Sequence, residues 1–130
     1  MANVKLNFVL ACDQAFQEDK SGKSSIIGIF NKIGAKGVPA VNPRFSIVVS
    51  TYGDPGNYVE VLKIINKQDN SVIASVKGNI EIKLGGKNTF VSNFTNVMFP
   101  VFGQYWFEVT VDGNVLTSPE LHYVVVEKNN

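Results

Sequence analysis

Short runs of β-branched and aromatic residues alternate with polar residues along almost the whole chain, and this period of two limits the possible folds more than any other feature. Side chains of a β-strand point alternately to the two faces of a sheet, whereas the pattern of an α-helix repeats every 3.6 residues. No segment carries a sustained helical repeat with a cap at each end. The alternation predicts strands at about 4–12, 24–32, 44–52, 57–66, 71–84, 89–98, 104–111 and 120–127.

Residues typical of tight turns separate these runs, so consecutive strands are expected to pair with each other. The turn sequences are GDPG at 53–56, KQDNS at 67–71, LGGKN at 84–88 and VDGN at 111–114. The Asp-Gly pair in the last of them is typical of a type I′ hairpin turn. Repeated local hairpins indicate antiparallel pairing.

Eight short strands joined by tight turns predict an all-β fold, namely an antiparallel β-sandwich of seven to eight strands. The 130 residues fit a single domain, 1–130, which is long enough to bury about two-thirds of its unfolded surface. The longer connections, 13–23 and 33–43, are expected to cross between sheets or to carry function. If each strand crosses the sandwich once, one end carries the loops 13–23, 53–56, 85–88 and 112–114, and the other carries 33–43, 67–70 and 99–103.

Charge and cysteine content argue against several classes of protein. The formal net charge is +1 and the basic residues are scattered, whereas nucleic-acid binding needs clustered cations. Cys12 is the single cysteine, so no intrachain disulfide can form and a reducing compartment is favoured. The apolar stretch before Asp13 is too short for a membrane span, and no signal-peptide cleavage pattern follows it. We therefore expect a cytoplasmic protein that binds neither nucleic acid nor membrane.

The stretch SGKSSIIG at 21–28 looks like the end of a phosphate-binding loop. Such a loop requires the spacing G-x-x-x-x-G-K-[ST] and a helix after it. With Gly22 and Lys23 as its last part, the first glycine would stand at position 17, which is Gln17. The residues that follow are β-branched and predict a strand. We interpret the stretch as the polar end of a loop that enters the second strand.

No combination of residues predicts catalysis or a bound cofactor. His122, the single histidine, lies in a predicted strand, and nothing in its spacing brings it to Cys12 or to a serine. Cys12 continues the alternating apolar set that runs from Val4 to Leu10, which places it on the buried face as a small core residue. One cysteine and one histidine cannot supply the four ligands of a zinc site. The sequence therefore predicts a protein that is not an enzyme.

Carboxylates give the one indication of a metal. Strand parity gathers Asp13, Asp19, Asp54 and Asp112 at one end of the sandwich, and calcium takes six to eight oxygen ligands. Aspartate is also a common turn residue, and no D-x-D-x-D spacing appears, so solvated turns are favoured over a calcium site. The four aspartates remain weak calcium candidates.

Aromatic residues supply the candidates for a contact surface. The alternation in QYWFEVTVDG places the odd positions from Tyr105 to Val111 on a buried face and Trp106 among polar neighbours on the other. Trp106 is either covered by a loop or an edge, or exposed as an anchor for a partner. Phe99 and Phe102 lie in a predicted loop and are expected to plug the end of the sandwich, with an oligomer or ligand contact as the alternative. Tyr58 is a candidate platform for stacking a sugar.

Three long stretches carry a resemblance to a known group of proteins. They are ACDQAFQEDKSGKSSIIGIFNKI, NPRFSIVVSTYGDPGNYVEVLKI and NFTNVMFPVFGQYWFEVTVDGNVLTSPELHYVV. Together they resemble a family of small bacterial β-sandwich proteins of uncharacterised function. The resemblance implies an immunoglobulin-like sandwich of bacterial or phage origin, with no catalytic residues to carry over. It also implies that Gly103 allows a sharp turn and that the Tyr105 hydroxyl reaches the backbone.

Two functions from different classes stay open. The first is a non-catalytic protein-interaction or assembly module that associates with itself or a protein partner, through an edge strand or through Trp106, Phe99 or Phe102. The second is a small-ligand module that binds carbohydrate by stacking on Trp106 or Tyr58, or calcium at the acidic loop ends. The first predicts an oligomer or a neighbouring partner, and the second predicts a monomer with a concave site.

Overall fold

The alternating runs form strands throughout the described chain. The structure, a computed structural model, describes residues 3–18 and 23–129. Within these ranges, no helix is long and apolar enough to cross a membrane. The same ranges contain ten strands: β1 (Val4–Gln17), β2 (Ser24–Phe30), β3 (Lys32–Ala35), β4 (Ala40–Gly53), β5 (Gly56–Asn66), β6 (Val72–Ile82), β7 (Lys87–Phe99), β8 (Gly103–Val111), β9 (Asn114–Val115) and β10 (Tyr123–Lys128).

All eight predicted ranges contain a strand, but the prediction of seven to eight strands is too low. β3 begins at the end of the predicted strand 24–32 and continues into the predicted connection 33–43, and the short β9 follows the turn after β8. β1 continues to Gln17 instead of ending near residue 12, and β4 begins at Ala40 instead of residue 44. The longer β4 has a physical reason, because residues 40–42 pair with 97–99 of β7 on the far side of Pro43.

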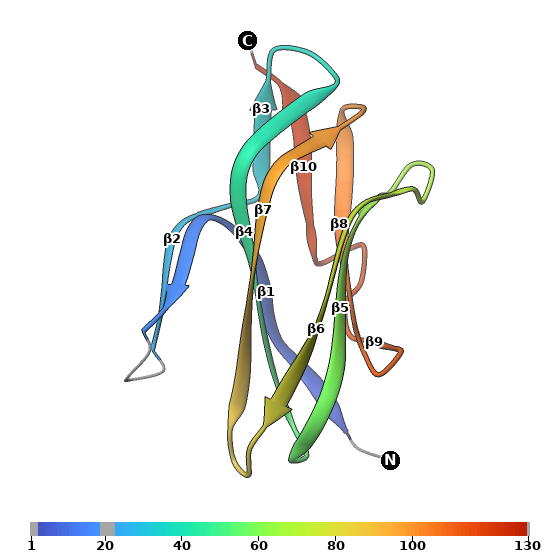
Figure 1. The fold of residues 1–130 in the computed structure, drawn as a ribbon. Helices are drawn as coiled ribbons and strands as arrows, with labels where there is room; N and C mark the ends of the chain where they lie inside the picture. Colours follow the sequence, from blue (N-terminus) through green and yellow to red (C-terminus); the bar gives the residue numbers. More distant parts are fainter. Residues whose placement is uncertain (1–2, 19–22, 130) are drawn as a thin grey trace.

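Two sheets pack against each other (Figure 1). The first has the strand order β2-β1-β4-β7, and the second has the order β3-β10-β8-β5-β6 with β9 paired to β8. One pair corrects the prediction of a purely antiparallel sandwich, because β3 runs parallel to β10. Asn31 alone separates β2 from β3, so one run of chain pairs with β1 in the first sheet and then, in the same direction, with β10 in the second.

The β8–β9 turn has the conformation that its residues predict. Asp112 and Gly113 have φ of 47° and 83° and join the paired residues Val111 and Asn114, as a type I′ turn requires. Figure 1 shows the β4–β5 and β6–β7 turns at one end of the molecule and the β7–β8 connection at the opposite end, which agrees with strand parity.

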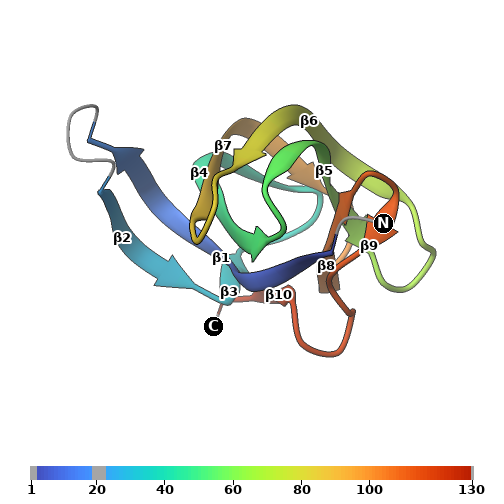
Figure 2. The same cartoon turned by 90° about the horizontal axis from the view of Figure 1, so that it is seen from below.

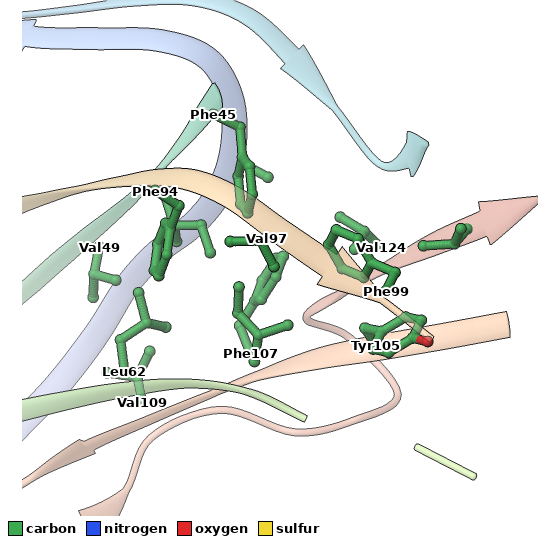
Figure 3. Close-up of a cluster of buried hydrophobic side chains, with 14 of the residues drawn as sticks. Phe45, Val49, Leu62, Phe94, Val97, Phe99, Tyr105, Phe107, Val109 and Val124 are labelled. Carbon is green, nitrogen blue, oxygen red and sulfur yellow. The ribbon is translucent and has the colours of Figure 1, made fainter. Parts of the chain in front are cut away.

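The main core lies between the two sheets (Figure 3). The odd positions of β8 from Tyr105 to Val109 point into it, and Val111 packs in a smaller cluster with Tyr58; all four side chains are buried, as predicted. The rings of Phe45 and Phe94 stack with centroids 5.2 Å apart. Phe99 packs edge-on against Tyr105 with centroids 4.9 Å apart. Aromatic packing therefore joins the first sheet to the second.

A bulge in β1 corrects the prediction that the apolar set from Val4 to Cys12 shares one face. The register between β1 and β4 shifts between Leu6 and Phe8. Val4 and Leu6 consequently pack on residues between the sheets, whereas Phe8 and Cys12 pack on the outer face of the first sheet. Cys12 is buried, but it lies outside the main core.

The part of the β1–β2 hairpin nearest its turn also packs on the outer face of the first sheet, together with Phe8 and Cys12. Ala15 and Ile26 pack with Val48, which alternates with core residues of β4 and so faces away from the second sheet. The Gln17 side chain donates a hydrogen bond of 2.9 Å to the carbonyl oxygen of Thr89 in β7. The hairpin therefore folds over the outer face of β4, and β2 forms the outermost strand of the sheet (Figure 2).

Candidate functional site

A pocket of about 450 Å³ lies between the start of β1 and the β8–β9 turn. Its lining, which defines the Tyr58 pocket, consists of Asn3, Val4, Tyr58, Val111, Asp112, Asn114 and Leu116. Val4, Val111 and Leu116 give it apolar walls and belong to a small hydrophobic cluster separate from the main core. The polar members are two asparagines, one aspartate and the tyrosine.

Tyr58 is held in place by the turn that precedes it. Its hydroxyl donates a hydrogen bond of 2.7 Å to the carbonyl oxygen of Asp54, four residues earlier. The side chain is only 6% exposed. A sugar cannot stack on a ring that is covered to this extent, so the prediction of Tyr58 as a stacking platform is corrected.

Two of the aspartates that the sequence analysis singled out lie near Tyr58. The Oδ1 atom of Asp112 accepts a hydrogen bond of 2.8 Å from the backbone N–H of Val59, and the Oδ2 atom of Asp54 accepts one of 2.9 Å from the N–H of Asn3. Burial, followed by the negative charges of Asp54 and Asp112, raises the pKa of the Tyr58 hydroxyl. Within the described ranges neither aspartate forms an ion pair.

The four calcium candidates do not converge on one site. Asp13 lies in β1, with its carboxyl group against Gly28 of β2. Asp19 lies outside the described residues. Among residues 3–18 and 23–129, no group of three His, Cys, Asp or Glu side chains could hold a metal ion. Of the three candidates that the structure describes, Asp54 and Asp112 lie together, beside Tyr58.

Trp106 is half-buried on the outer face of β8. It lies opposite Ile65 of β5 on one side and Tyr123 of β10 on the other. Directly paired side chains point to the same face of a sheet, so the three residues form an apolar row across the second sheet. The neighbours cover part of the indole ring and leave the rest at the surface.

Phe99 and Phe102 close the end of the sandwich near the β7–β8 connection. Phe99 is the last residue of β7, not a loop residue, and it is buried against Tyr105. Phe102 is partly buried and packs on the main core. Phe99 therefore offers no surface to a partner, which corrects its prediction as a contact residue.

Cys12 and His122 make structural contacts. The Cys12 thiol donates a hydrogen bond of 3.6 Å to the carbonyl oxygen of Ser46, and burial raises its pKa. The Nδ1 atom of His122 accepts a hydrogen bond of 3.1 Å from the backbone N–H of Ser118, just before β10. At the SGKS motif, Gly22 lies outside the described residues, and the strand β2 begins directly after Lys23.

Glu60 is a buried carboxyl group that the sequence analysis does not single out. It alternates with Tyr58 and Leu62 on the inner face of β5 and is fully buried. Neither of its carboxyl oxygens has a hydrogen-bond partner among the described residues. Burial raises the pKa of Glu60 to about 7. The sequence contains a sign of this buried carboxyl group, because Glu60 stands at a position of the strand where the alternation predicts an apolar, inward-facing residue.

The free edge of β2 is a second candidate surface. Among the described strands β2 pairs with β1 alone, so within this part of the chain its other edge presents unpaired backbone donors and acceptors. Natural edge strands usually carry charges that prevent pairing with other chains. The segment 24–30 has no charged residue, and Ile27 and Ile29 are 52% and 63% exposed. We call residues 24–30 the β2 edge.

Comparison with known proteins gives a match over most of the chain. The model of a family described as "Family of unknown function (DUF6941)" matches residues 7–124. No curated protein matches the sequence. The matched range includes the β2 edge, Trp106 and most of the Tyr58 pocket.

Proposed function

The chain belongs to the DUF6941 family, and we propose that it is a non-catalytic interaction module that binds a second copy of itself through the β2 edge. The observation that carries the proposal is the uncharged free edge of a strand that also exposes two isoleucines. Another extended backbone can pair with a row of free N–H and C=O groups by strand addition, so the partner surface in this proposal is itself a strand. The β2 edge of a second copy has this chemistry.

Antiparallel pairing of two β2 edges across a two-fold axis joins two four-stranded sheets into one. Gly28, with φ of 71°, interrupts the extended geometry, so regular pairing is expected over residues 24–27. Phe16 lies next to Ile27 on one face of the hairpin, because Phe16 pairs with Ser25 and Gln14 with Ile27. Both side chains are about half exposed, and a neighbouring copy would bury them. A closed two-fold dimer is also the commonest form of self-association.

The non-catalytic part of the proposal is supported by the state of the reactive groups. Cys12 is buried, His122 accepts a backbone hydrogen bond, and Glu60 lies inside the sandwich away from the surface. A general base must reach the proton that it removes from a substrate. Neither the Cys12 thiol nor the Glu60 carboxyl group lies where a substrate could reach it.

The proposal also includes an immunoglobulin-like fold, a bacterial or phage origin and a cytoplasmic location for this protein. A tyrosine at the start of β8 that bonds to backbone four residues earlier supports an immunoglobulin-like sandwich, because such domains carry a tyrosine corner at this position. The resemblance given above supports a bacterial or phage origin. A single, reduced cysteine supports a cytoplasmic location.

The test is the mass of the protein in solution, measured by light scattering over a range of concentrations. We expect the wild type to reach twice its chain mass of 14.2 kDa. Ile27→Lys should be monomeric, because two opposed β2 edges would then carry like charges. Leu84→Lys is the matched control, since it adds the same charge at an exposed turn residue away from the edge, and it should remain dimeric. A monomeric wild type, or a dimeric Ile27→Lys, would contradict the proposal.

A further inference from the structure

The Tyr58 pocket has the composition of a ligand site. Its volume of about 450 Å³ falls within the range of small-molecule sites, about 300–1,000 Å³. Such sites combine apolar walls with a few fixed polar groups. Here Val4, Val111 and Leu116 form the walls. Val4 is the first residue of β1, whereas β1 pairs with β2 only from Ala11 onward. The pocket is therefore a surface separate from the β2 edge.

Asp112 is oriented before any ligand arrives. Its backbone N–H donates a hydrogen bond of 2.9 Å to the Val59 carbonyl oxygen, while its Oδ1 atom accepts the bond from the Val59 N–H. These two bonds fix the carboxylate on the turn and leave the Oδ2 atom without a hydrogen bond inside the described part of the chain. Asn3 and Asn114 also line the pocket, and an asparagine side chain carries an acceptor oxygen.

Within the described part of the chain, no cationic side chain compensates the charge of the pocket. None of the lining residues is a lysine or arginine, and within residues 3–18 and 23–129 Asp112 forms no ion pair. Asp54 adds a second negative charge close to Tyr58. A carboxylate beside apolar walls is stabilised by a cation that can also bury hydrocarbon.

We propose that the Tyr58 pocket binds a small organic ammonium ion with a short apolar body. The ammonium group donates hydrogen bonds to the Oδ2 atom of Asp112 and to the amide oxygen of Asn3 or Asn114. The hydrocarbon body packs on Val4, Val111 and Leu116. This site extends beyond the proposed self-association, because it takes a small molecule at a different part of the fold.

Two other ligand classes fit the pocket less well. Calcium takes six to eight oxygen ligands, whereas this lining has one carboxylate and three apolar walls. A sugar would need an open aromatic face, and the Tyr58 ring is covered. An ammonium ion needs only one carboxylate, a few neutral acceptors and an apolar surface, all of which the lining provides.

The test is a titration of the ¹⁵N-labelled protein with n-butylammonium, followed by backbone amide chemical shifts. We expect saturable shifts at Val4, Asp112, Asn114 and Leu116, with a dissociation constant on the order of millimolar for so small a ligand. The neutral 1-butanol and the anionic butyrate are the matched probes. Both should bind at least about tenfold more weakly, because they lack the charge that Asp112 recognises.

Asp112→Asn separates charge recognition from folding. Asparagine tolerates the positive φ of position 112 and keeps the acceptor for the Val59 N–H, so the variant should fold normally. It should weaken n-butylammonium binding by about tenfold or more. Glu127→Gln removes an equal charge from an exposed position of β10 and should have no effect.

Three results would overturn the inference. They are the absence of saturable shifts, equal binding of 1-butanol, and an unchanged dissociation constant in Asp112→Asn. Competition by millimolar calcium at the same amides would point to a metal site and would also overturn it. The shifts report on the pocket alone, so none of these results bears on dimer formation through β2.

Discussion

The hydroxyl of Tyr105 donates a hydrogen bond of 2.7 Å to the carbonyl oxygen of Val101 and accepts one of 3.1 Å from the backbone N–H of the same residue. At the other end of the molecule, Tyr58 donates a bond of the same length to the carbonyl oxygen of Asp54. In both places the accepting residue stands four positions before the tyrosine. Two tyrosines thus tie the turns that open β8 and β5 to the buried part of the sandwich.

Removing the Tyr105 hydroxyl should lower the stability of the protein. We expect Tyr105→Phe to reduce the free energy of unfolding by about 1 kcal/mol or slightly more, because both backbone groups of Val101 lose their partner. Tyr58→Phe should cost less, since it breaks one bond. Urea denaturation measures both changes. Tyr52→Phe is the control, because Tyr52 is exposed and its hydroxyl forms no hydrogen bond within the described chain. Equal effects of Tyr105→Phe and Tyr52→Phe would contradict this account.

Glu60 should make the protein less stable as the pH rises. The pKa of Glu60 is about 7 in the folded protein, against 4.5 for an unperturbed glutamate. Between these two values the folded state keeps a proton that the unfolded state has released, so the free energy of unfolding falls as the pH increases and levels off above about 7. At about 1.4 kcal/mol per pH unit, the full loss is on the order of 3 kcal/mol.

Denaturation of wild type and Glu60→Gln across pH 4.5–8 tests this dependence. Glu60→Gln should lack the fall, because an amide does not titrate. Glu81→Gln, at an exposed position on neighbouring β6, should retain it. A wild type whose stability stays flat or rises across this range would show that Glu60 is not protonated in the folded state.

Close packing across the two sheets should make Gly78 difficult to replace. A Cβ atom added at Gly78 would lie 2.6 Å from the Cζ atom of Phe90. We expect Gly78→Ala to cost about 1–3 kcal/mol of unfolding free energy through overpacking. In a Phe90→Leu background the same change should cost less, because the far edge of the ring is gone. A double-mutant cycle measures the difference, and equal costs in the two backgrounds would exclude the contact as the cause.

Much of the fold could be predicted from the sequence because its strands alternate cleanly. The set from Tyr105 to Val111 and the Asp-Gly turn at 112–113 follow directly from local rules, and the structure agrees with both. The predicted start of β4 was too late because of Pro43. Proline lacks the backbone N–H that donates to a neighbouring strand, so a strand is not expected to continue through it. Pairing with β7 continues on its far side, and the side chain of Asn42 accepts a hydrogen bond from the Arg44 N–H.

The remaining features depend on contacts between distant parts of the chain. No local residue pattern marks the bulge between Leu6 and Phe8 that moves Cys12 to the outer face. The parallel pairing of β3 with β10 follows from a sheet crossing at Asn31, which has no signature of its own. Asp112 and Tyr58 could be named as candidates from the sequence. That they line one pocket together with Val4 could not be predicted, because these residues are far apart along the chain. Glu60 was detectable in principle, since it breaks the apolar phase of β5.

The buried thiol of Cys12 should report on the hairpin that covers it. Burial raises the pKa of Cys12, and the thiolate is the reactive form, so a thiol reagent should label the native protein far more slowly than free cysteine. Gln17→Ala removes the hydrogen bond to Thr89 that holds the hairpin and should speed labelling. Gln68→Ala, a change of the same kind in the β5–β6 turn, should not. Fast labelling of the wild type would show that the outer cluster is open.

Pairing of two β2 edges is the central claim, and amide hydrogen exchange at low and high protein concentration tests it most directly. We expect the amides of residues 24–27 that point to the free edge to become protected as concentration rises, while amides elsewhere stay unchanged. Ile27→Lys should remove the concentration dependence. If residues 24–27 exchange at the same rate at both concentrations while light scattering shows a dimer, the chains associate through another surface and the proposed interface is wrong.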